Sequence, residues 1–298
     1  MTATAEGPSI PVTPWQKLRV VLEMIKIEHT LFALPFAFLG ALLAANGLPT
    51  AWQIVWILVA MVGARSAAMA FNRLVDREYD ARNPRTRMRA LPAGLVSVPF
   101  VTGFTLVMSG LLVLAAGMLN PLALALSPVA LLLVFFYSLT KRFTAWSHAF
   151  LGLALSVAPV GAWVAVRGSL AEPTPFLLAA AVVCWLIGFD IIYALQDVEF
   201  DEKAGLHSMP VALGPLRALW LGRAAHALMI VFLVLMGQAA GLGLWYYVGV
   251  VLAAALIAYE HAIIRPDDLR RLNVAFFYVN IAVSSGLLLF TALDVFTR

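Results

Sequence analysis

Charged residues are scarce in this chain. Asp, Glu, Lys and Arg make up 12% of its 298 residues, whereas hydrophobic residues make up 62%. Soluble globular domains carry about 25% charged residues, and a soluble core of this size could not hide so much apolar surface. The low charge therefore excludes an ordinary soluble domain and indicates a protein that lies in a lipid bilayer.

Cysteine is nearly absent as well, because Cys184 is the single one in the chain. This excludes an intramolecular disulfide. The sequence also has no nucleophile elbow, no Walker A loop and no dinucleotide-binding fingerprint. No metal-ligand spacing relates His148, His207, His226 and His261.

Long apolar runs divide the chain into membrane spans. A spanning helix needs about 20 mostly apolar residues. We predict nine such helices, near residues 29–46, 51–71, 99–119, 121–140, 145–166, 174–194, 214–237, 241–263 and 272–293. We therefore expect an all-α polytopic membrane protein in which residues 1–298 form a single domain around a central cavity, with residues 1–16 as a flexible N-terminal tail.

The basic residues are distributed unevenly over the loops. Nearly all of the 20 Lys and Arg residues fall in alternate loops, while Arg167 and Arg298 lie on the other side and Arg65 lies inside a span. By the positive-inside rule this predicts a cytoplasmic N-terminus and a C-terminus on the opposite side. The distribution also accounts for the net charge of +4 without a nucleic-acid partner.

Two rows of polar residues interrupt the apolar pattern at predicted cytoplasmic helix ends. The first row contains Arg65, Asn72, Asp76 and Asp80, and the second contains Asp190, Asp197 and Asp201. Spacings of seven and four put each row on one face of a helix. Carboxylates repeated in this way repel each other and are costly near lipid, so positive charge must compensate. Because Mg²⁺ commonly takes one or two carboxylates together with phosphate oxygens, we predict that the rows bind Mg²⁺ with a diphosphate between them.

Salt bridges are the alternative explanation of any single carboxylate, because Arg73, Arg77 and Arg82 lie close to the first row and Lys203 follows the second. Two rows with matched spacing on one side of the membrane favour the metal site. Glu78 and Glu199 fall on the opposite helix faces and are expected in solvent.

The basic residues of these loops are candidates for contact with the diphosphate, which needs cations as its bond to carbon breaks. They include Arg85 and Lys141, although basic residues collect on this side for topological reasons too. Arg65 lies deeper, and it either anchors a carboxylate of a second substrate or neutralises Asp76. The predicted substrate-binding set is Asn72, Arg65, Asp190, Tyr193, Gln196 and Arg85. Glu28 and His29 are polar residues at the entry of the first span, where they either line the cavity or are merely interfacial.

Four segments, taken in order, resemble the UbiA superfamily of intramembrane aromatic prenyltransferases. They are residues 72–80, which read NxxxDxxxD; residues 85–94; residues 137–142, which read YxxxKR; and residues 190–201, which continue to Gly205, Ser208 and Pro210. The resemblance covers nearly the whole chain. It implies two substrates, a polyprenyl diphosphate and a planar aromatic acceptor, and a multi-pass protein of the bacterial inner membrane.

The resemblance also implies roles for individual residues. Asp76, Asp80, Asp197 and Asp201 would hold Mg²⁺ and the diphosphate, and the catalytic residues would be Asp76, Asp197, Lys141 and Tyr137. Ionisation of the prenyl diphosphate would give an allylic carbocation, shielded from water, that attacks a ring carbon ortho to a hydroxyl group.

The acceptor depends on the branch of the family. Residues 25–36 and 63–70 look like those of a bacterial branch whose members act on 4-hydroxybenzoate, the acceptor that we predict, or on 1,4-dihydroxy-6-naphthoate in the futalosine route to menaquinone. Both acids carry a carboxylate that suits Arg65. Two other classes remain as alternatives: a membrane cation or solute transporter, which would place its acids near the bilayer midplane, and a CDP-alcohol phosphotransferase, whose Asp-Gly-x2-Ala-Arg elements are absent here.

Overall fold

The computed structural model describes residues 14–25 and 30–298, and the regular structure in these ranges is helical apart from an isolated β-bridge between Arg265 and Asp268. The predicted all-α class is confirmed. The expected N-terminal tail, residues 1–16, falls largely outside the described ranges, except that residues 14–16 begin the first helix. Glu28 and His29 lie outside the described residues too.

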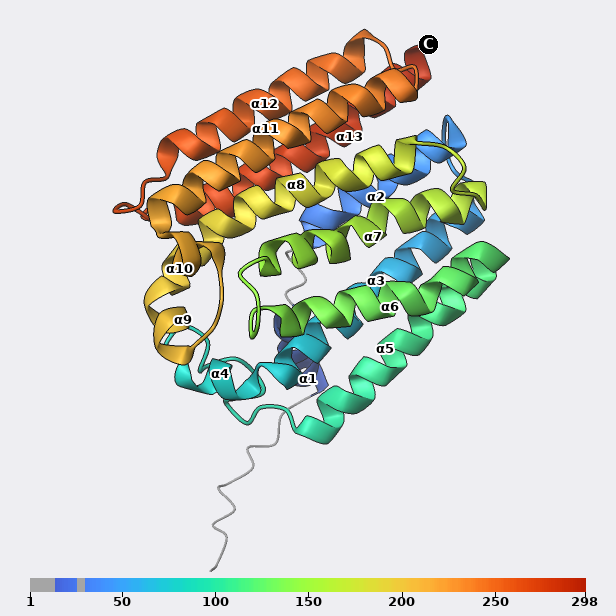
Figure 1. The fold of residues 1–298 in the computed structure, drawn as a ribbon. Coiled ribbons are helices and arrows are strands. Elements are labelled where there is room, and N and C mark those ends of the chain that lie inside the picture. Colours follow the sequence, from blue (N-terminus) through green and yellow to red (C-terminus); the bar gives the residue numbers. More distant parts are fainter. Residues whose placement is uncertain (1–13, 26–29) are drawn as a thin grey trace, which may run out of the picture.

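The helices follow one another as in Figure 1. The long ones are α2 (Thr30–Ala45), α3 (Ala51–Val75), α5 (Val98–Leu119), α6 (Pro121–Thr140), α7 (Ser147–Arg167), α8 (Thr174–Ala194), α11 (Pro215–Ala239), α12 (Leu244–Ile263) and α13 (Asn280–Thr297). The short ones are α1 (Pro14–Met24), α4 (Arg77–Arg82), the 3-10 turn η2 (Leu195–Asp197), α9 (Val198–Ala204), α10 (Met209–Leu213) and the π-helical segment η3 (Val274–Val279).

Among the described residues, eight helical segments are long and apolar enough to cross a membrane. They coincide with eight of the nine predicted spans, namely α3, α5, α6, α7, α8, α11, α12 and the continuous η3–α13 segment. The remaining predicted span, near residues 29–46, corresponds to α2, which has 16 residues and follows a stretch outside the described ranges. The chain is thus a multi-pass membrane protein, and the ninth span stays a prediction.

Turn residues in the sequence set the helix ends. Thr50 precedes α3 and accepts a hydrogen bond from the Gln53 backbone N–H at 3.2 Å, while the Gln53 side chain accepts from the Thr50 N–H, which forms a capping box. Asn120 caps α6 through the Ala123 N–H at 2.9 Å. Its side-chain NH₂ donates to the Val164 carbonyl oxygen at 2.8 Å, so the same residue ties the α5–α6 turn to α7.

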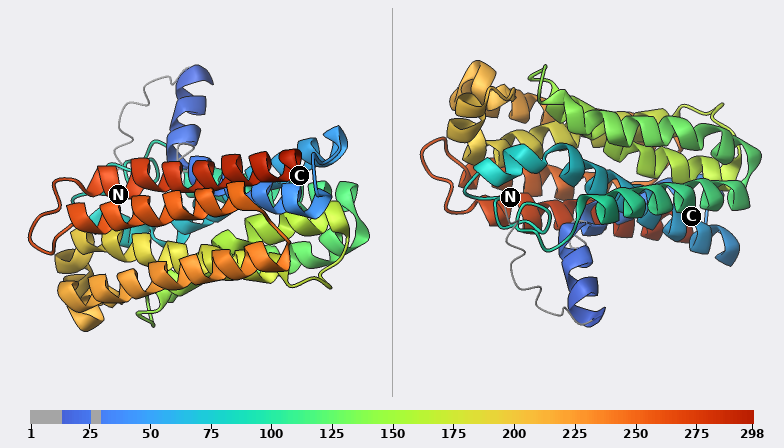
Figure 2. Two further views of the ribbon diagram at one scale, coloured as in Figure 1. Left: turned by 90° about the horizontal axis from the view of Figure 1, so that it is seen from above. Right: turned by 90° about the horizontal axis from the view of Figure 1, so that it is seen from below.

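The long helices run side by side, with α8, α11, α12 and α13 on one side and α3, α5 and α6 on the other (Figures 1 and 2). Helices α2 and α7 lie between these groups and pack against each other. Small residues permit close approach, as is usual in membranes. At Gly63 of α3, an added Cβ atom would lie 2.8 Å from the Leu112 backbone nitrogen of α5.

Both acidic rows contain a helix break at their central aspartate. Asp76 separates α3 from α4 with φ −92° and ψ 3°, and Asp197, the last residue of η2, directly precedes α9 with φ −105° and ψ 0°. This sparsely populated backbone region often holds active-site residues. The helix on whose face each row was predicted is thus interrupted at the central aspartate. The breaks put α4 and α9 at the same end of the bundle (Figure 1).

Candidate functional site

A cavity of about 970 Å³ lies among α3, α5, α6, α7 and α8. The acidic residues that line it come from the end where α4 and α9 are found, and the opposite end is lined by apolar residues such as Leu119, Ala123 and Leu170. Its lining includes the predicted site residues Arg65, Asn72, Asp76, Asp80, Arg85, Tyr137, Lys141, Asp190, Tyr193, Asp197 and Asp201. Gln196 is not in the lining, because its side chain donates to the Tyr193 carbonyl oxygen at 2.9 Å.

Asp76 is buried at the break between α3 and α4, and three side chains meet it. Asn72, one helical turn earlier, donates to its Oδ2 atom at 3.0 Å. From the C-terminal end of α6, Lys141 Nζ lies 3.2 Å from Oδ2 and Arg142 Nη2 lies 3.2 Å from Oδ1. The YxxxKR segment therefore delivers its two cations to the first acidic row.

Asp80 is also buried. Arg89 of the following loop lies 2.7 Å from its Oδ1 atom, and Arg73 of α3 lies 3.8 Å from Oδ2. The Thr86 hydroxyl donates to the Asp80 carbonyl oxygen at 3.0 Å. The loop after α4 therefore folds back over the acidic row.

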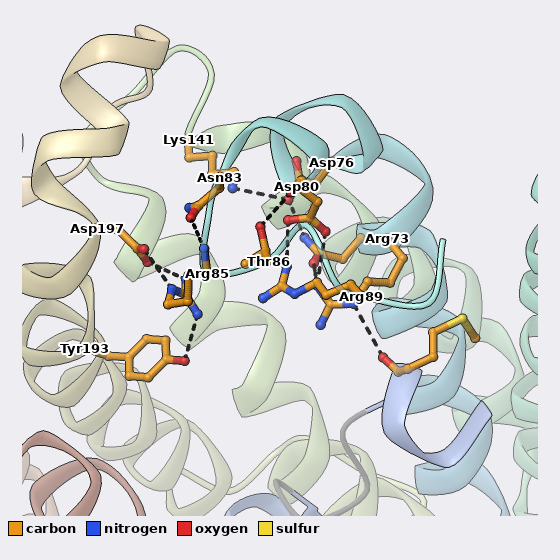
Figure 3. A network of polar contacts seen from close by, with 12 residues as sticks. Arg73, Asp76, Asp80, Asn83, Arg85, Thr86, Arg89, Lys141, Tyr193 and Asp197 are labelled. Carbon is orange, nitrogen blue, oxygen red and sulfur yellow. Dashed lines mark hydrogen bonds and ion pairs between the residues drawn. The ribbon is translucent and has the colours of Figure 1, made fainter. Parts of the chain in front are cut away.

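The second row is held by a residue of the first loop. Arg85 donates to Asp197 through two hydrogen bonds, Nε to Oδ1 at 2.9 Å and Nη2 to Oδ2 at 2.6 Å, and Nη1 donates to the Tyr193 hydroxyl at 3.3 Å. Burial by itself would lower the pKa of Arg85, but the bonds to Asp197 and its negative charge outweigh that effect and raise the pKa. Arg85 thus connects the loop that follows the first row to the central aspartate of the second row (Figure 3).

Asp190 lies deeper on α8 and has a different kind of partner. Its Oδ2 atom is 2.6 Å from Nδ1 of His148, which is buried near the start of α7. The other ring nitrogen, Nε2, accepts a hydrogen bond from the Met209 backbone N–H at 3.2 Å. The imidazole therefore connects the cavity wall to α10.

An aromatic group forms the cavity wall beside Tyr193. The rings of Tyr193 and Phe276 have centroids 4.1 Å apart, and those of Phe189 and Phe276 are 5.5 Å apart. Phe276 belongs to the π-helical segment η3, where the Asn280 side chain donates to the Ala275 and Phe276 carbonyl oxygens at 3.0 and 3.1 Å. The Asn280 side-chain oxygen accepts from Trp185 Nε1 at 2.6 Å.

The donor set of the cavity suits a hard divalent cation that is shared with a ligand. Carboxylates from both rows line one space, and the Oδ2 atom of Asp80 is buried with no hydrogen-bond partner among the described residues. In the part of the chain that the structure describes, no group of three or more His, Cys, Asp or Glu side chains could hold a metal ion by itself. The arrangement fits Mg²⁺, which usually combines one or two carboxylates with phosphate oxygens and water.

Several contacts were not evident from the sequence. The salt-bridge alternative named neighbours in the chain, yet of these only Arg73 contacts the first row, while Arg77 pairs with Glu78 at 3.7 Å. The stronger partners, Arg89 and Arg142, come from other segments. Nothing in the sequence indicated that His148 belongs to the site, because its partner Asp190 is 42 residues away. Nothing indicated that Phe276 belongs to the cavity wall either.

Two other expectations concern the outer faces of the short helices. The side chain of Glu78 is 71% exposed and that of Glu199 is 86% exposed. Both carboxylates were expected in solvent, and both expectations are confirmed. These residues are useful controls, since they carry the same charge as the cavity aspartates but face away from the cavity.

Residues 33–282 match the UbiA prenyltransferase family. A relative from Vibrio cholerae serotype O1, named 4-hydroxybenzoate octaprenyltransferase, is 34% identical over 287 residues, which are 92% of this chain and 96% of the relative.

Solved structures of similar proteins have the same fold. A UbiA homologue from Aeropyrum pernix K1, in its apo form, is 36% identical and superposes with a TM-score of 0.82 over 90% of this chain and 98% of that one. A UbiA homologue from Archaeoglobus fulgidus, bound to DMAPP and Mg²⁺, is 20% identical, with a TM-score of 0.65 over 90% of this chain and 98% of that one.

Proposed function

The chain belongs to the UbiA prenyltransferase family and is a prenyl-transferring enzyme, and from that premise we propose that it transfers a polyprenyl group from a polyprenyl diphosphate to 4-hydroxybenzoate with the help of Mg²⁺. The observation that carries the proposal is that carboxylates of both acidic rows line one and the same cavity, whose other end is apolar. Such a cavity matches a substrate with a charged diphosphate head and a long hydrocarbon tail.

The diphosphate end is proposed to lie between Asp76 and Asp197, in contact with the basic residues that hold these carboxylates without substrate. Lys141, Arg142 and Arg85 have their charged groups within 3.2 Å of aspartate oxygens. A diphosphate brings negative charge of its own, so these cations can move from carboxylate to phosphate while the carboxylates turn to the metal. Mg²⁺, when bound, supplies further positive charge to the diphosphate oxygens as they leave.

The reaction begins when the bond between the prenyl C1 atom and the diphosphate oxygen breaks and its electron pair stays with the oxygen. Lys141 and Arg85 are in a position to stabilise that developing negative charge. The allylic carbocation that remains would react with water, and the apolar cavity wall excludes water from it. Tyr137 lies in the wall one helical turn before Lys141, where its electron-rich ring can stabilise positive charge.

The acceptor is proposed to lie deeper in the cavity, with its carboxylate toward Arg65 and its hydroxyl edge toward the diphosphate. Arg65 lines the cavity on α3, and the helical rise sets it about 16 Å from Asp76 along the axis. The name of the Vibrio cholerae relative supports 4-hydroxybenzoate as the acceptor. 1,4-Dihydroxy-6-naphthoate is the alternative acid, because it too presents a carboxylate.

We further propose that the whole chain forms one domain in the bacterial inner membrane, with both acidic rows on the cytoplasmic side. The unequal distribution of basic loop residues supports this orientation. A prenyl diphosphate would then enter with its charged head at the cytoplasmic surface. A cysteine added in the α3–α5 loop should react with a membrane-impermeant reagent only when the cytoplasmic face is accessible.

The central test compares Asp76→Asn and Asp197→Asn with Glu78→Gln and Glu199→Gln. Purified variants receive a polyprenyl diphosphate, 4-hydroxybenzoate and Mg²⁺, and the product is identified by mass. We expect each cavity variant to lose about 100-fold or more in kcat, while the two exposed controls keep their rates. Full turnover by either Asp variant would refute the metal and diphosphate assignment.

A parallel incubation with 1,4-dihydroxy-6-naphthoate decides between the two acceptors. The transporter alternative predicts ion flux in proteoliposomes without any prenylated product. Asp76 and Asp197 directly precede α4 and α9, which lie at one end of the bundle (Figure 1), and this position favours the transferase.

A further inference from the structure

The pair formed by Asp190 and His148 is separate from the ion pairs that hold the diphosphate end of the cavity. Asp190 lines the cavity and its side chain is 21% exposed, whereas His148 is 4% exposed behind it. The Oδ2 atom of Asp190 is 2.6 Å from Nδ1 of His148. Its Oδ1 atom accepts no hydrogen bond from any residue that the structure describes.

The protonation of His148 follows from its second contact. Nε2 accepts the Met209 backbone N–H at 3.2 Å, and a ring nitrogen that accepts a hydrogen bond carries no proton. The remaining proton of the neutral ring is therefore on Nδ1, which donates it to Asp190. The histidine is a neutral donor that fixes the direction of the carboxylate, as outer partners of functional side chains commonly do.

Asp190 differs in this respect from three other carboxylates of the cavity. Asp76, Asp80 and Asp197 each lie against Arg or Lys side chains, whose positive charge neutralises them. Asp190 instead contacts an imidazole, and no Arg or Lys of the described residues forms an ion pair with it. Of these four carboxylates, it is the one without a cationic partner, which leaves it for another purpose.

The position of Asp190 indicates what that purpose is. It lies seven residues before Asp197 on the same side of the cavity, which corresponds to about 10 Å deeper along α8. Arg65 on α3 lies deeper still, at about 16 Å from Asp76 along the helix axis. Asp190 is thus between the proposed levels of the diphosphate and of the acceptor carboxylate, where the reacting edge of the ring would be found.

We propose that Asp190 is the base that removes the proton from the prenylated ring carbon, and that His148 is the positioning residue that orients it. This inference rests on the proposed function. When the prenyl C1 atom bonds to the ring, that carbon carries both the new C–C bond and its hydrogen. The C–H electron pair then returns to the ring, the proton goes to Asp190 Oδ1, and diphosphate has left with the electron pair of its C–O bond. No oxidant or other reactant is needed.

The test replaces the hydrogen atoms at the reacting ring carbons with deuterium. Wild type and Asp190→Asn receive an equimolar mixture of 4-hydroxybenzoate and its 3,5-dideuterated form, and the products are compared by mass. In the wild type we expect a product ratio near one, because proton loss is much faster than reversal of the C–C bond formation. In Asp190→Asn we expect kcat to fall by about 100-fold and the ratio to favour the undeuterated acceptor, since proton loss is now slow enough to compete with reversal.

A structural role of Asp190 would not produce an isotope effect. If Asp190→Asn turns over slowly with a ratio of one, or keeps the wild-type rate, the inference is wrong while the proposed function stands. If the wild type itself gives no prenylated hydroxybenzoate, the proposed function fails and the inference fails with it. Glu199→Gln, which removes an exposed carboxylate of α9, should match the wild type in both rate and ratio.

Two substitutions of His148 separate the effects of its two hydrogen bonds. They also test the proposed roles of Asp190 and His148 if Asp190→Asn does not fold. The amide nitrogen of Asn matches the position of Nδ1, so His148→Asn keeps a donor for Asp190. Gln reaches the position of Nε2, so His148→Gln keeps an acceptor for the Met209 N–H. If His148 acts through Asp190, the Asn variant retains the higher kcat with an unchanged KM for the acceptor. A higher kcat in the Gln variant would show that His148 serves only to hold α10, and would overturn its assigned role.

Discussion

Arg85 and Asp197 form a bidentate ion pair across the polar end of the cavity, although 112 residues separate them in the chain. The pair joins the loop that follows the first acidic row to the central aspartate of the second. It therefore closes the two halves of the site around the space proposed for the diphosphate. Because the guanidinium also reaches the Tyr193 hydroxyl, the aromatic wall is part of the same network.

Arg85→Gln should weaken binding of the prenyl diphosphate. The variant loses a cation that is available to the phosphates, and we expect its KM for the diphosphate to rise about tenfold, as for the loss of one charge-assisted hydrogen bond. The KM of Arg85→Lys for the diphosphate should lie between those of the wild type and Arg85→Gln, because lysine keeps the charge but not the planar guanidinium group. Steady-state kinetics with Arg87→Gln, an exposed neighbour outside the cavity lining, provide the control. An unchanged KM in Arg85→Gln would exclude the contact.

Arg65→Ala should raise the KM for the aromatic acid more than the KM for the prenyl diphosphate. The reason is that Arg65 lines the cavity far from Asp76, to which we assign the diphosphate. A neutral analogue, 4-hydroxybenzamide, makes the measurement sharper, since the wild type should prefer the acid strongly and the variant should not. The opposite change in the two KM values would move Arg65 to the diphosphate site.

Removal of Mg²⁺ should abolish both turnover and ligand-induced stabilisation. A ligand that binds the folded state raises the melting temperature, so a non-hydrolysable prenyl diphosphate analogue should stabilise the detergent-purified protein when Mg²⁺ is present and not after chelation. Asp76→Asn should lose this response even with Mg²⁺. Equal stabilisation with and without the metal would show that the basic residues alone hold the diphosphate.

Ala123→Phe should restrict the length of the prenyl chain that the enzyme accepts. Ala123 lines the apolar end of the cavity, about 27 Å from Lys141 along α6. A larger ring there shortens the space for the tail, so kcat/KM should fall for long donors and stay the same for short ones. Leu124→Phe is the matched control, because Leu124 is 44% exposed on the outer face of the same helix. Equal effects on all donor lengths would argue against a tail site at this end.

Asn280→Leu should destabilise the protein by about 1–2 kcal/mol, the upper range for hydrogen bonds within membranes. The substitution removes the acceptor of Trp185 Nε1–H and the donor for the Phe276 carbonyl oxygen. Thermal unfolding in detergent measures the effect, with Thr291→Val as a control that breaks only a bond within its own helix. Because Phe276 packs on Tyr193, the KM for the substrates should rise as well. A melting temperature like that of the control would show that the π-helical segment does not depend on Asn280.

The sequence predicted most of the helical framework. The boundaries expected at 121–140 and 174–194 agree with α6 and α8, because a span is recognised from the length of one apolar run and the breakers at its ends. The short helices α4, α9 and α10 were not predicted. They lie in polar loops, where no apolar period marks a helix.

The candidate site was predicted in part, because helical spacing indicates which side chains share a face. The spacing of seven and four pointed the cavity residues Asn72 and Asp76 in one direction, and it remained informative even though Asp76 breaks the helix. It could not predict that Asp80 would be buried against Arg89. Burial of a carboxylate depends on how a loop folds over it, and that is not encoded in helical periodicity.

The sequence by itself determined which segments enter the membrane and which residue types stand at their ends, because bilayer thickness and the need to satisfy every backbone hydrogen bond act on each segment separately. Only the tertiary structure decided which side chain contacts each aspartate of the cavity. Arg85 meets Asp197, Lys141 meets Asp76 and His148 meets Asp190 because helices distant in the chain pack side by side. Such contacts arise from the shape of the whole bundle, and this shape determines whether a carboxylate meets a cation, as Asp76 and Asp197 do, or a histidine, as Asp190 does.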